Sequence, residues 1–373
     1  TQDPIEKQID HLLSQMTLEE KIGQMNQLDP SWSAEEKEAQ IREGLVGSIF
    51  NIVDPQEVNR LQRMAVEETR LGIPLLVARD VIHGFRTIYP IPLGQAATFD
   101  PALVEEAARL TADEAVQAGV RWTFSPMVDI VRDARWGRVN ESNGEDVYLG
   151  EQFTKAYIEG YQGENLSDLN SIGACAKHFV GYGAVEAGRE YNNVDMSELL
   201  LRQKYLKPFK KAVESNVLSV MTAFNPINGV PMICNEYLCK DVLKDEYNFK
   251  GFTISDYNAG NELLNHKVAK NEFEAARRCI QAELDIEMVS ETYLHHLEEL
   301  DHGGNALKDV ELYYPLLMVK DFDSQEFKES SEFMTNADVP TLAMDQLIEN
   351  PVNPFTGKAI NMDEKFAHEQ MVI

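Results

Sequence analysis

The sequence predicts an α/β fold in which a parallel sheet closes into a (β/α)8 TIM-like barrel, followed by a short C-terminal appendage. Short apolar, β-branched runs alternate with amphipathic helical patterns seven times over about 290 residues, and this length favours a barrel over an open sheet. No G-x-G-x-x-G fingerprint follows the first run, which disfavours a dinucleotide-binding sheet. Because only seven runs stand out, we expect the eighth strand to be irregular or missing.

The seven runs are each rich in apolar and β-branched residues and are followed by a turn. They are GLVGSIFNI (44–52), IPLLVARD (73–80), RWTFSPMVDI (121–130), SIGACAKHF (171–179), NVLSVMTAFN (216–225), FKGFTISD (249–256) and AELDIEMV (282–289). Between them, residues 101–119 and 196–215 have apolar residues at helical spacing. Pro101 stands at a helix-opening position and Gly119 at a closing one, so a helix is predicted there.

Composition and charge exclude several classes of function. The chain has 373 residues, of which 43% are hydrophobic, as in globular proteins. Its net charge of -28 repels phosphate backbones and anionic membrane surfaces, and no run approaches the ~18 apolar residues that span a bilayer. We therefore expect no nucleic-acid partner and no membrane association. The start, TQDPIEKQID, does not look like a signal peptide. The protein is periplasmic or secreted if a signal was removed, and cytoplasmic otherwise.

The predicted strand ends carry chemically useful side chains, and barrel enzymes place their sites at these ends. The side chains are Asp80, Asp129, Lys177, His178, Met221, Phe224, Asp256 and Met288. One Asp at a strand end is commonly a helix cap. Carboxylates, a Lys-His pair and aromatic residues together indicate a polar, aromatic-lined pocket for an uncharged, polyhydroxylated ligand.

Six segments in order carry a resemblance to a known family. They are MTLEEKIGQM (16–25), ARDVIHGFRTIYPIPLGQAATFD (78–100), RDARWGRVNESNGEDVYLG (132–150), KHFVGYGAVEAGREYNNVDMS (177–197), SVMTAFNPINGVPMICN (219–235) and FTISDYNAG (252–260). With them the chain closely resembles the N-terminal barrel of glycoside hydrolase family 3, the β-glucosidase and β-xylosidase family, over about residues 5–298. We expect no cofactor and no metal ion at the site.

The resemblance implies roles for five residues. Asp256 is the carboxylate that attacks the anomeric carbon and forms the covalent glycosyl-enzyme of a retaining glycosidase. Asp80, Arg138, Lys177 and His178 match positions that hold the hydroxyls of the terminal sugar. Since neighbouring side chains of a regular strand point to opposite faces, Lys177 and His178 reach one sugar only where the strand ends and the backbone turns.

Other matched residues are expected to complete the pocket. Met221 forms its floor and Tyr257 stacks on the sugar, while a second group supports the side chains that touch it. This second group is Glu145, Arg189, Tyr191 and Phe224. For Arg138, a purely structural ion pair with Glu145 or Asp146 is an equal alternative.

One loop separates the activities within the family. Members that act on N-acetylglucosamine carry an Asp-x-His pair after the Lys-His-Phe strand, whereas this chain reads VGYGAVEAGREYNN there. The resemblance therefore implies an exo-acting β-glucosidase whose partner is a β-glucoside or an oligosaccharide. A β-xylosidase is the alternative.

The C-terminal segment does not continue the resemblance. In glucosidase-type members the acid/base glutamate comes from a second domain, and nothing in the sequence places Glu326, Glu329 or Glu332 at the site. We therefore expect residues 1–300 to form the barrel and 301–373 an appendage of uncertain fold. A sugar-binding barrel with little turnover stays open as another function. We also expect the appendage, or a second copy of the chain in a homo-oligomer, to cover apolar surface on the barrel rim.

The appendage has a weak likeness of its own. Residues 301–361 resemble the C-terminal part of sulfatase-like proteins of the alkaline phosphatase superfamily, in which an Asp-His-Gly supplies metal ligands. Two ligand-type residues, Asp301 and His302, do not make a metal site without the others. This likeness therefore adds no metal to the prediction.

Overall fold

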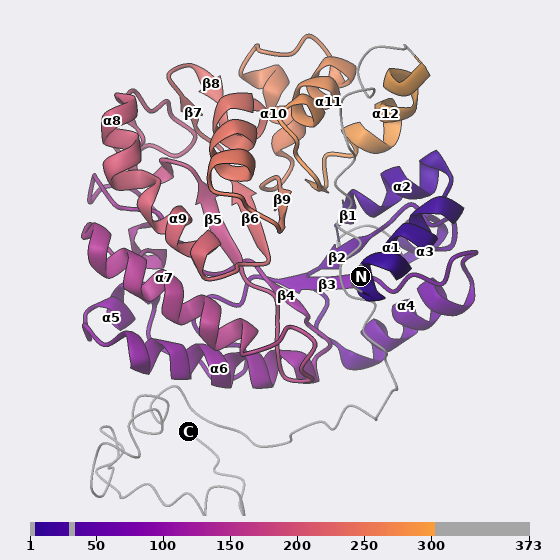
Figure 1. The fold of residues 1–373 in the computed structure, drawn as a ribbon, viewed down its shortest axis with the longest axis horizontal. Helices are drawn as coiled ribbons and strands as arrows, with labels where there is room; N and C mark the ends of the chain where they lie inside the picture. The colour runs from indigo at the N-terminus through magenta and orange to yellow at the C-terminus, as the bar shows by residue number, and fades with distance from the viewer. Residues whose placement is uncertain (1–3, 30–33, 303–373) are drawn as a thin grey trace, which may run out of the picture.

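The computed structural model describes residues 4–29 and 34–302, and these form a closed barrel of short strands surrounded by helices (Figure 1). Within these residues eight parallel strands make up the barrel. They are β1 (Asn26–Leu28), β2 (Ser48–Phe50), β3 (Leu76–Arg79), β4 (Trp122–Thr123), β5 (Cys175–Phe179), β6 (Ser219–Thr222), β9 (Phe252–Ile254) and β10 (Glu287–Met288). A small antiparallel hairpin, β7 (Pro226–Ile227) with β8 (Val230–Pro231), follows β6. The (β/α)8 prediction is confirmed.

Strand pairing runs around the whole barrel. Hydrogen-bonded neighbours follow the orders β10-β1-β2-β3-β4 and β5-β6-β9. Two isolated parallel bridges join these groups, from Trp122 to Gly173 between β4 and β5 and from Ile254 to Ile286 between β9 and β10. The sheet therefore has no free edge in the described part of the chain, as closure of a barrel requires.

The eighth strand is the first in the chain, β1. Its two polar residues are buried and hydrogen-bonded: Asn26 donates to the Leu45 carbonyl at 2.9 Å, and Gln27 donates to the Ser48 hydroxyl at 3.1 Å. A three-residue strand of this kind has no apolar run to reveal it. Each of the seven predicted runs does contain a strand.

The helices pack around the strands, with α6 and α7 along one side of the barrel and α2, α3 and α4 along another (Figure 1). They are α1 (Pro4–Gln15), α2 (Leu18–Gln24), α3 (Ala34–Arg42), α4 (Pro55–Glu67), α5 (Pro92–Ala96), α6 (Pro101–Gln117), α7 (Val147–Gln162), α8 (Glu198–Leu200), α9 (Lys207–Glu214), α10 (Ala259–Asn265), α11 (Glu272–Gln281) and α12 (Thr292–His302).

The predicted helix at 101–119 is α6, and local chemistry explains both of its ends. The Asp100 carboxylate accepts hydrogen bonds from the first free backbone N–H groups, and Pro101 needs no such partner. Gly119 closes it with a φ of 84°, which favours glycine. The predicted helix at 196–215 contains α8, a π-helical turn (Leu201–Tyr205) and α9.

Side chains fill the barrel centre. The Trp122 ring lies 5.0 Å from the rings of both Phe124 and Phe252, and Met221 and Met288 belong to the same buried cluster. The interior is thus a packed core, and a ligand can be bound only at an end of the barrel.

The described chain continues slightly past the expected domain boundary, since α12 ends at His302. The sulfatase-like likeness of residues 303–361 and the role of the appendage lie outside the described residues and stay predictions. No helix in the described ranges is long and apolar enough to cross a bilayer.

Candidate active site

Asp256 lies two residues after the end of β9, at the carboxyl end of the barrel, and its two oxygens have different surroundings. Oδ1 accepts a hydrogen bond of 2.7 Å from the Tyr257 backbone N–H. Oδ2 is buried without a hydrogen-bond partner among the described residues, 3.5 Å from Nε2 of His178. One oxygen is therefore held by the backbone while the other is free to react.

Lys177 and His178 both reach this end of the barrel from β5. The Lys177 ammonium lies 2.7 Å from Oδ1 of Asp80, which follows β3. Pairing between β5 and β6 shifts register between Lys177 and Phe179. The strand is therefore irregular where both side chains must reach one site, and the structure brings Asp80, Lys177, His178 and Asp256 together.

A buried carboxylate orients the His178 ring. Oδ2 of Asp129 lies 2.9 Å from both the backbone nitrogen and Nδ1 of His178. Burial, with the nearby charges of Arg138 and Lys177, holds the pKa of His178 well below its usual value, so the ring is neutral at pH 7. A neutral imidazole adds no charge beside Asp256 and presents Nε2 to the site.

Arg138 forms its ion pair with a residue that the sequence did not single out. Its guanidinium donates to Glu141 through two bonds, of 2.8 and 2.9 Å, because the 3-10 turn Val139–Glu141 brings both side chains to one side. Glu145 is exposed, and Asp146 caps α7 instead. The guanidinium stays close enough to Asp256 for its charge to lower the pKa of that carboxyl.

Aromatic side chains border the cluster. The Tyr191 ring lies 4.7 Å from the Phe224 ring and is 48% exposed. Tyr257 is 47% exposed, and its hydroxyl donates to Asp29 at 2.6 Å. Met221 is buried in the barrel core, and its role as the floor of the pocket stays a prediction. The Arg189 side chain is exposed, and no contact in the described residues draws it into the cluster.

The sequence analysis assigned no role to four residues around the site: Asp29, Asp129, Glu141 and Tyr182. Asp129 was visible as a strand-end carboxylate but had no assigned role. Asp29 follows β1, the strand that the apolar pattern missed, so its position could not be predicted. Glu141 and Tyr182 lie in loop turns within the matched segments, where spacing alone does not show which way a side chain points.

Burial raises the pKa of Asp256 to about 6. The Tyr257 N–H and the charges of Lys177 and Arg138 oppose this effect, while the charge of Asp80 adds to it. Asp256 is therefore ionised at neutral pH in spite of its burial, which a carboxylate nucleophile requires.

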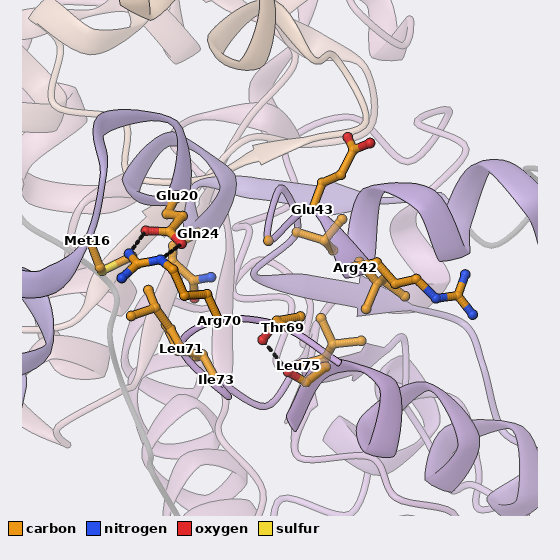
Figure 2. A pocket seen from close by; sticks show the side chains of 14 residues that line it. Met16, Glu20, Gln24, Arg42, Glu43, Thr69, Arg70, Leu71, Ile73 and Leu75 are labelled. Atoms are coloured by element: carbon orange, nitrogen blue, oxygen red, sulfur yellow. Dashed lines mark hydrogen bonds and ion pairs between the residues drawn. The ribbon is translucent and has the colours of Figure 1, made fainter. Parts of the chain in front are cut away.

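A separate pocket lies at the other end of the barrel (Figure 2). Its lining includes Gln24, Val46 and Leu75, which precede β1, β2 and β3, whereas Asp80 and Asp256 follow their strands. Figure 2 shows Arg70 turned toward the Glu20 carboxylate, to which its Nε donates at 2.9 Å. This end of a barrel usually serves stability, so the pocket is not part of the candidate site.

Comparison with known proteins identifies the family. Residues 17–312 match the N-terminal domain of glycosyl hydrolase family 3. The chain belongs to this family. The resemblance seen in the sequence is thereby confirmed, and so is a fold of the family's barrel type.

Relatives within glycosyl hydrolase family 3 include glucosidases and xylosidases. The chain is 41% identical over 297 residues to a periplasmic β-glucosidase of Salmonella typhimurium, covering 79% of this chain and 39% of the relative. It is 37% identical over 330 residues to a β-xylosidase of Formosa agariphila, covering 85% and 40%. A crystal structure of a β-glucosidase from Listeria innocua in complex with glucose aligns with a TM-score of 0.76 at 41% identity, covering 80% and 44%. The chain thus spans less than half the length of these relatives.

Proposed function

We propose that this chain is the catalytic barrel of a retaining, exo-acting β-glucosidase. In the proposed reaction Oδ2 of Asp256 attacks the anomeric carbon of a terminal β-D-glucosyl residue. The bond between the anomeric carbon and the leaving oxygen breaks, and its electron pair stays on that oxygen. A general acid other than Asp256 protonates this oxygen, and the alcohol is released. The observation that carries the proposal is the buried Oδ2 of Asp256, which has no hydrogen-bond partner in residues 4–29 and 34–302 and lies near the cationic Lys177 and Arg138 and the neutral His178.

The surrounding residues suit a sugar rather than an anion. Asp80 accepts hydroxyl protons and Lys177 donates to hydroxyl oxygens, and their mutual ion pair leaves this side of the site nearly neutral. Arg138 is likewise neutralised by Glu141. Tyr257 and Tyr191 offer exposed ring faces at the border of the site.

A glucoside with a good leaving group tests the nucleophile alone, because dinitrophenolate departs without a proton. We expect the full chain to release about one equivalent of dinitrophenolate from dinitrophenyl β-glucoside in a rapid burst. Rapid-quench or stopped-flow absorbance measures it. Steady turnover would also support the proposal and add a working acid/base. No release combined with retained glucose binding would instead support the sugar-binding alternative.

The β-xylosidase alternative is decided by the same measurement. Dinitrophenyl β-xyloside lacks only the hydroxymethyl group of the glucoside. A burst that is faster with the xyloside at saturating concentration would replace glucose by xylose as the proposed substrate. The similarity to the β-xylosidase of Formosa agariphila supports this alternative.

The pH dependence of glycosylation provides a further test. Since Asp256 attacks as the carboxylate and burial raises its pKa to about 6, the rate should fall as the pH falls through about 6. Well below that point the loss should approach about tenfold per pH unit. Inactivation by a 2-fluoro-glucoside with a dinitrophenyl leaving group, followed across the acid range, measures this limb. A rate that stays constant through pH 6 would show that Asp256 is not the titrating nucleophile.

A further inference from the structure

Tyr182 and Glu190 form a part-buried, hydrogen-bonded pair next to two residues of the candidate site. Tyr182 begins the 3-10 turn Tyr182–Ala184, which follows β5, and is almost fully buried. Its hydroxyl donates a hydrogen bond to Oε2 of Glu190. Burial and the Glu190 carboxylate raise the pKa of Tyr182 far above its usual value, so the tyrosine keeps its proton and remains the donor.

The Tyr182 ring contacts two of the residues proposed to hold the sugar. It meets the His178 ring edge to face with centroids 5.4 Å apart. The Arg138 guanidinium carbon lies 5.8 Å from the centre of the same ring, within cation–π range. Trp136 and Phe224 also pack edge-on against the ring, with centroids 5.4 and 6.1 Å away. The Tyr182 ring is therefore a packing surface for both His178 and Arg138.

His178 and Arg138 each have a carboxylate partner in addition to the Tyr182 ring. Asp129 holds His178 through Nδ1 and the backbone, which fixes one edge of the imidazole. Glu141 holds Arg138 by the edge of the guanidinium. The Tyr182 ring contacts both residues in addition, and its hydroxyl is bonded to Glu190.

The Glu190 carboxylate has few other hydrogen bonds in the described part of the chain. Its Oε1 is buried with no hydrogen-bond partner among the described residues, so the bond to Tyr182 is the main polar contact of its carboxylate there. Burying a carboxylate oxygen without a partner is costly. A hydrogen-bonded pair at this place is therefore hard to explain as a device for stability alone.

We propose that Glu190 is a positioning residue for the glycosyl transfer to Asp256. Through its hydrogen bond to the Tyr182 hydroxyl, it holds the Tyr182 ring in the place where the ring aligns Arg138 and His178. This inference rests on the proposed function of the site. It assigns no contact with the sugar to either Glu190 or Tyr182.

Three variants of the full chain test the pair. Tyr182→Phe removes only the hydroxyl and Glu190→Ala removes the acceptor, while Glu190→Gln keeps an acceptor oxygen. Tyr293→Phe is the matched control, because Tyr293 is also buried and its hydroxyl donates to the Leu284 carbonyl at 2.9 Å, which precedes β10, rather than to a residue of the candidate site. Three quantities are measured: the rate of inactivation by the 2-fluoro-glucoside, the pH at which this rate falls on the acid side (the acid limb), and the affinity for glucose by calorimetry.

We expect Tyr182→Phe and Glu190→Ala each to slow inactivation by about tenfold, with the double variant no slower than either. Glu190→Gln should restore most of the rate, and Tyr293→Phe should keep all of it. The acid limb should move to higher pH in the two damaged variants, because a displaced Arg138 no longer lowers the pKa of Asp256. A purely structural pair would not move this limb. Among the charged groups that face Asp256, Lys177 and Arg138 lower its pKa, whereas Asp80 raises it. The half-buried Glu262 carries a like charge, and His178 is neutral beside the site.

Other outcomes overturn the inference. Inactivation rates and acid limbs equal to the wild type in Tyr182→Phe would do so, and so would additive losses in the double variant. Absence of any wild-type adduct would count against the proposed function instead. Glucose affinity in the same variants then decides the inference separately, since misplaced Arg138 and His178 must weaken binding.

Discussion

Replacing Asp256 by alanine should lower glycosylation by dinitrophenyl β-glucoside by at least about a thousandfold, because the substitution removes the carboxylate that attacks the anomeric carbon in the proposed reaction. The wild-type chain treated with a 2-fluoro-glucoside should gain the mass of one fluoroglucosyl group. Peptide mapping by mass spectrometry should place that group on Asp256. Attachment to any other residue would overturn the assignment.

Chemical rescue makes this test independent of folding. The shortened side chain in Asp256→Ala leaves room for a small anion, so azide should restore dinitrophenolate release. The product should then be the α-glucosyl azide, because a single displacement inverts the anomeric centre. An unrescued variant that still binds glucose would show that Asp256 holds the sugar without attacking it.

Replacing Asp80 by asparagine should weaken glucose binding by at least about tenfold, or ~1.4 kcal/mol. The amide keeps the shape of the side chain but removes the charge that neutralises Lys177, whose side chain is only 3% exposed. Lys177 would then face the site as an unpaired buried cation, and the strong acceptor for sugar hydroxyls would be lost. Because the Asp80 side chain is 45% exposed, solvent screens part of this effect, and we expect no larger loss from the ion pair alone.

Titration calorimetry with glucose measures the Asp80 effect. Asp54→Asn is the matched control, since Asp54 caps α4 through Gln56 N–H at 3.0 Å and asparagine caps a helix equally well. The control should bind glucose like the wild type. If Asp80→Asn does the same, Asp80 is a structural residue and the proposed hydroxyl clamp is wrong.

Apolar periodicity predicted the parts of this fold that bury apolar side chains. The seven predicted runs became strands because each contributes residues such as Ile49, Val77 or Ile254 to the interior. The strand β1 was missed because hydrogen bonds rather than apolar contacts hold Asn26 and Gln27 in place. Because β1 was missed, Asp29 was missed as well; this carboxylate follows β1 and accepts a hydrogen bond from the Tyr257 hydroxyl.

The site could be predicted where it lies on strand ends and less well where it lies on loops. Asp80, Lys177, His178 and Asp256 converge because parallel strands end at one face of a barrel. The partner of Arg138 depended on a 3-10 turn that places Glu141 within reach, and spacing does not reveal such a turn. The support given by Glu145 and Arg189 stays a prediction.

The pairing of β1 with β10 has a consequence for how the protein folds. Asn26 pairs with Glu287 and Gln27 with Met288, so the contacts that seal the barrel join segments about 260 residues apart in the chain. During synthesis both sheet edges must wait unpaired until the last strand emerges, and contacts of such long range form slowly. An unpaired edge invites pairing with another chain. The interval before β10 docks on β1 is therefore the stage at which this barrel is most prone to aggregate.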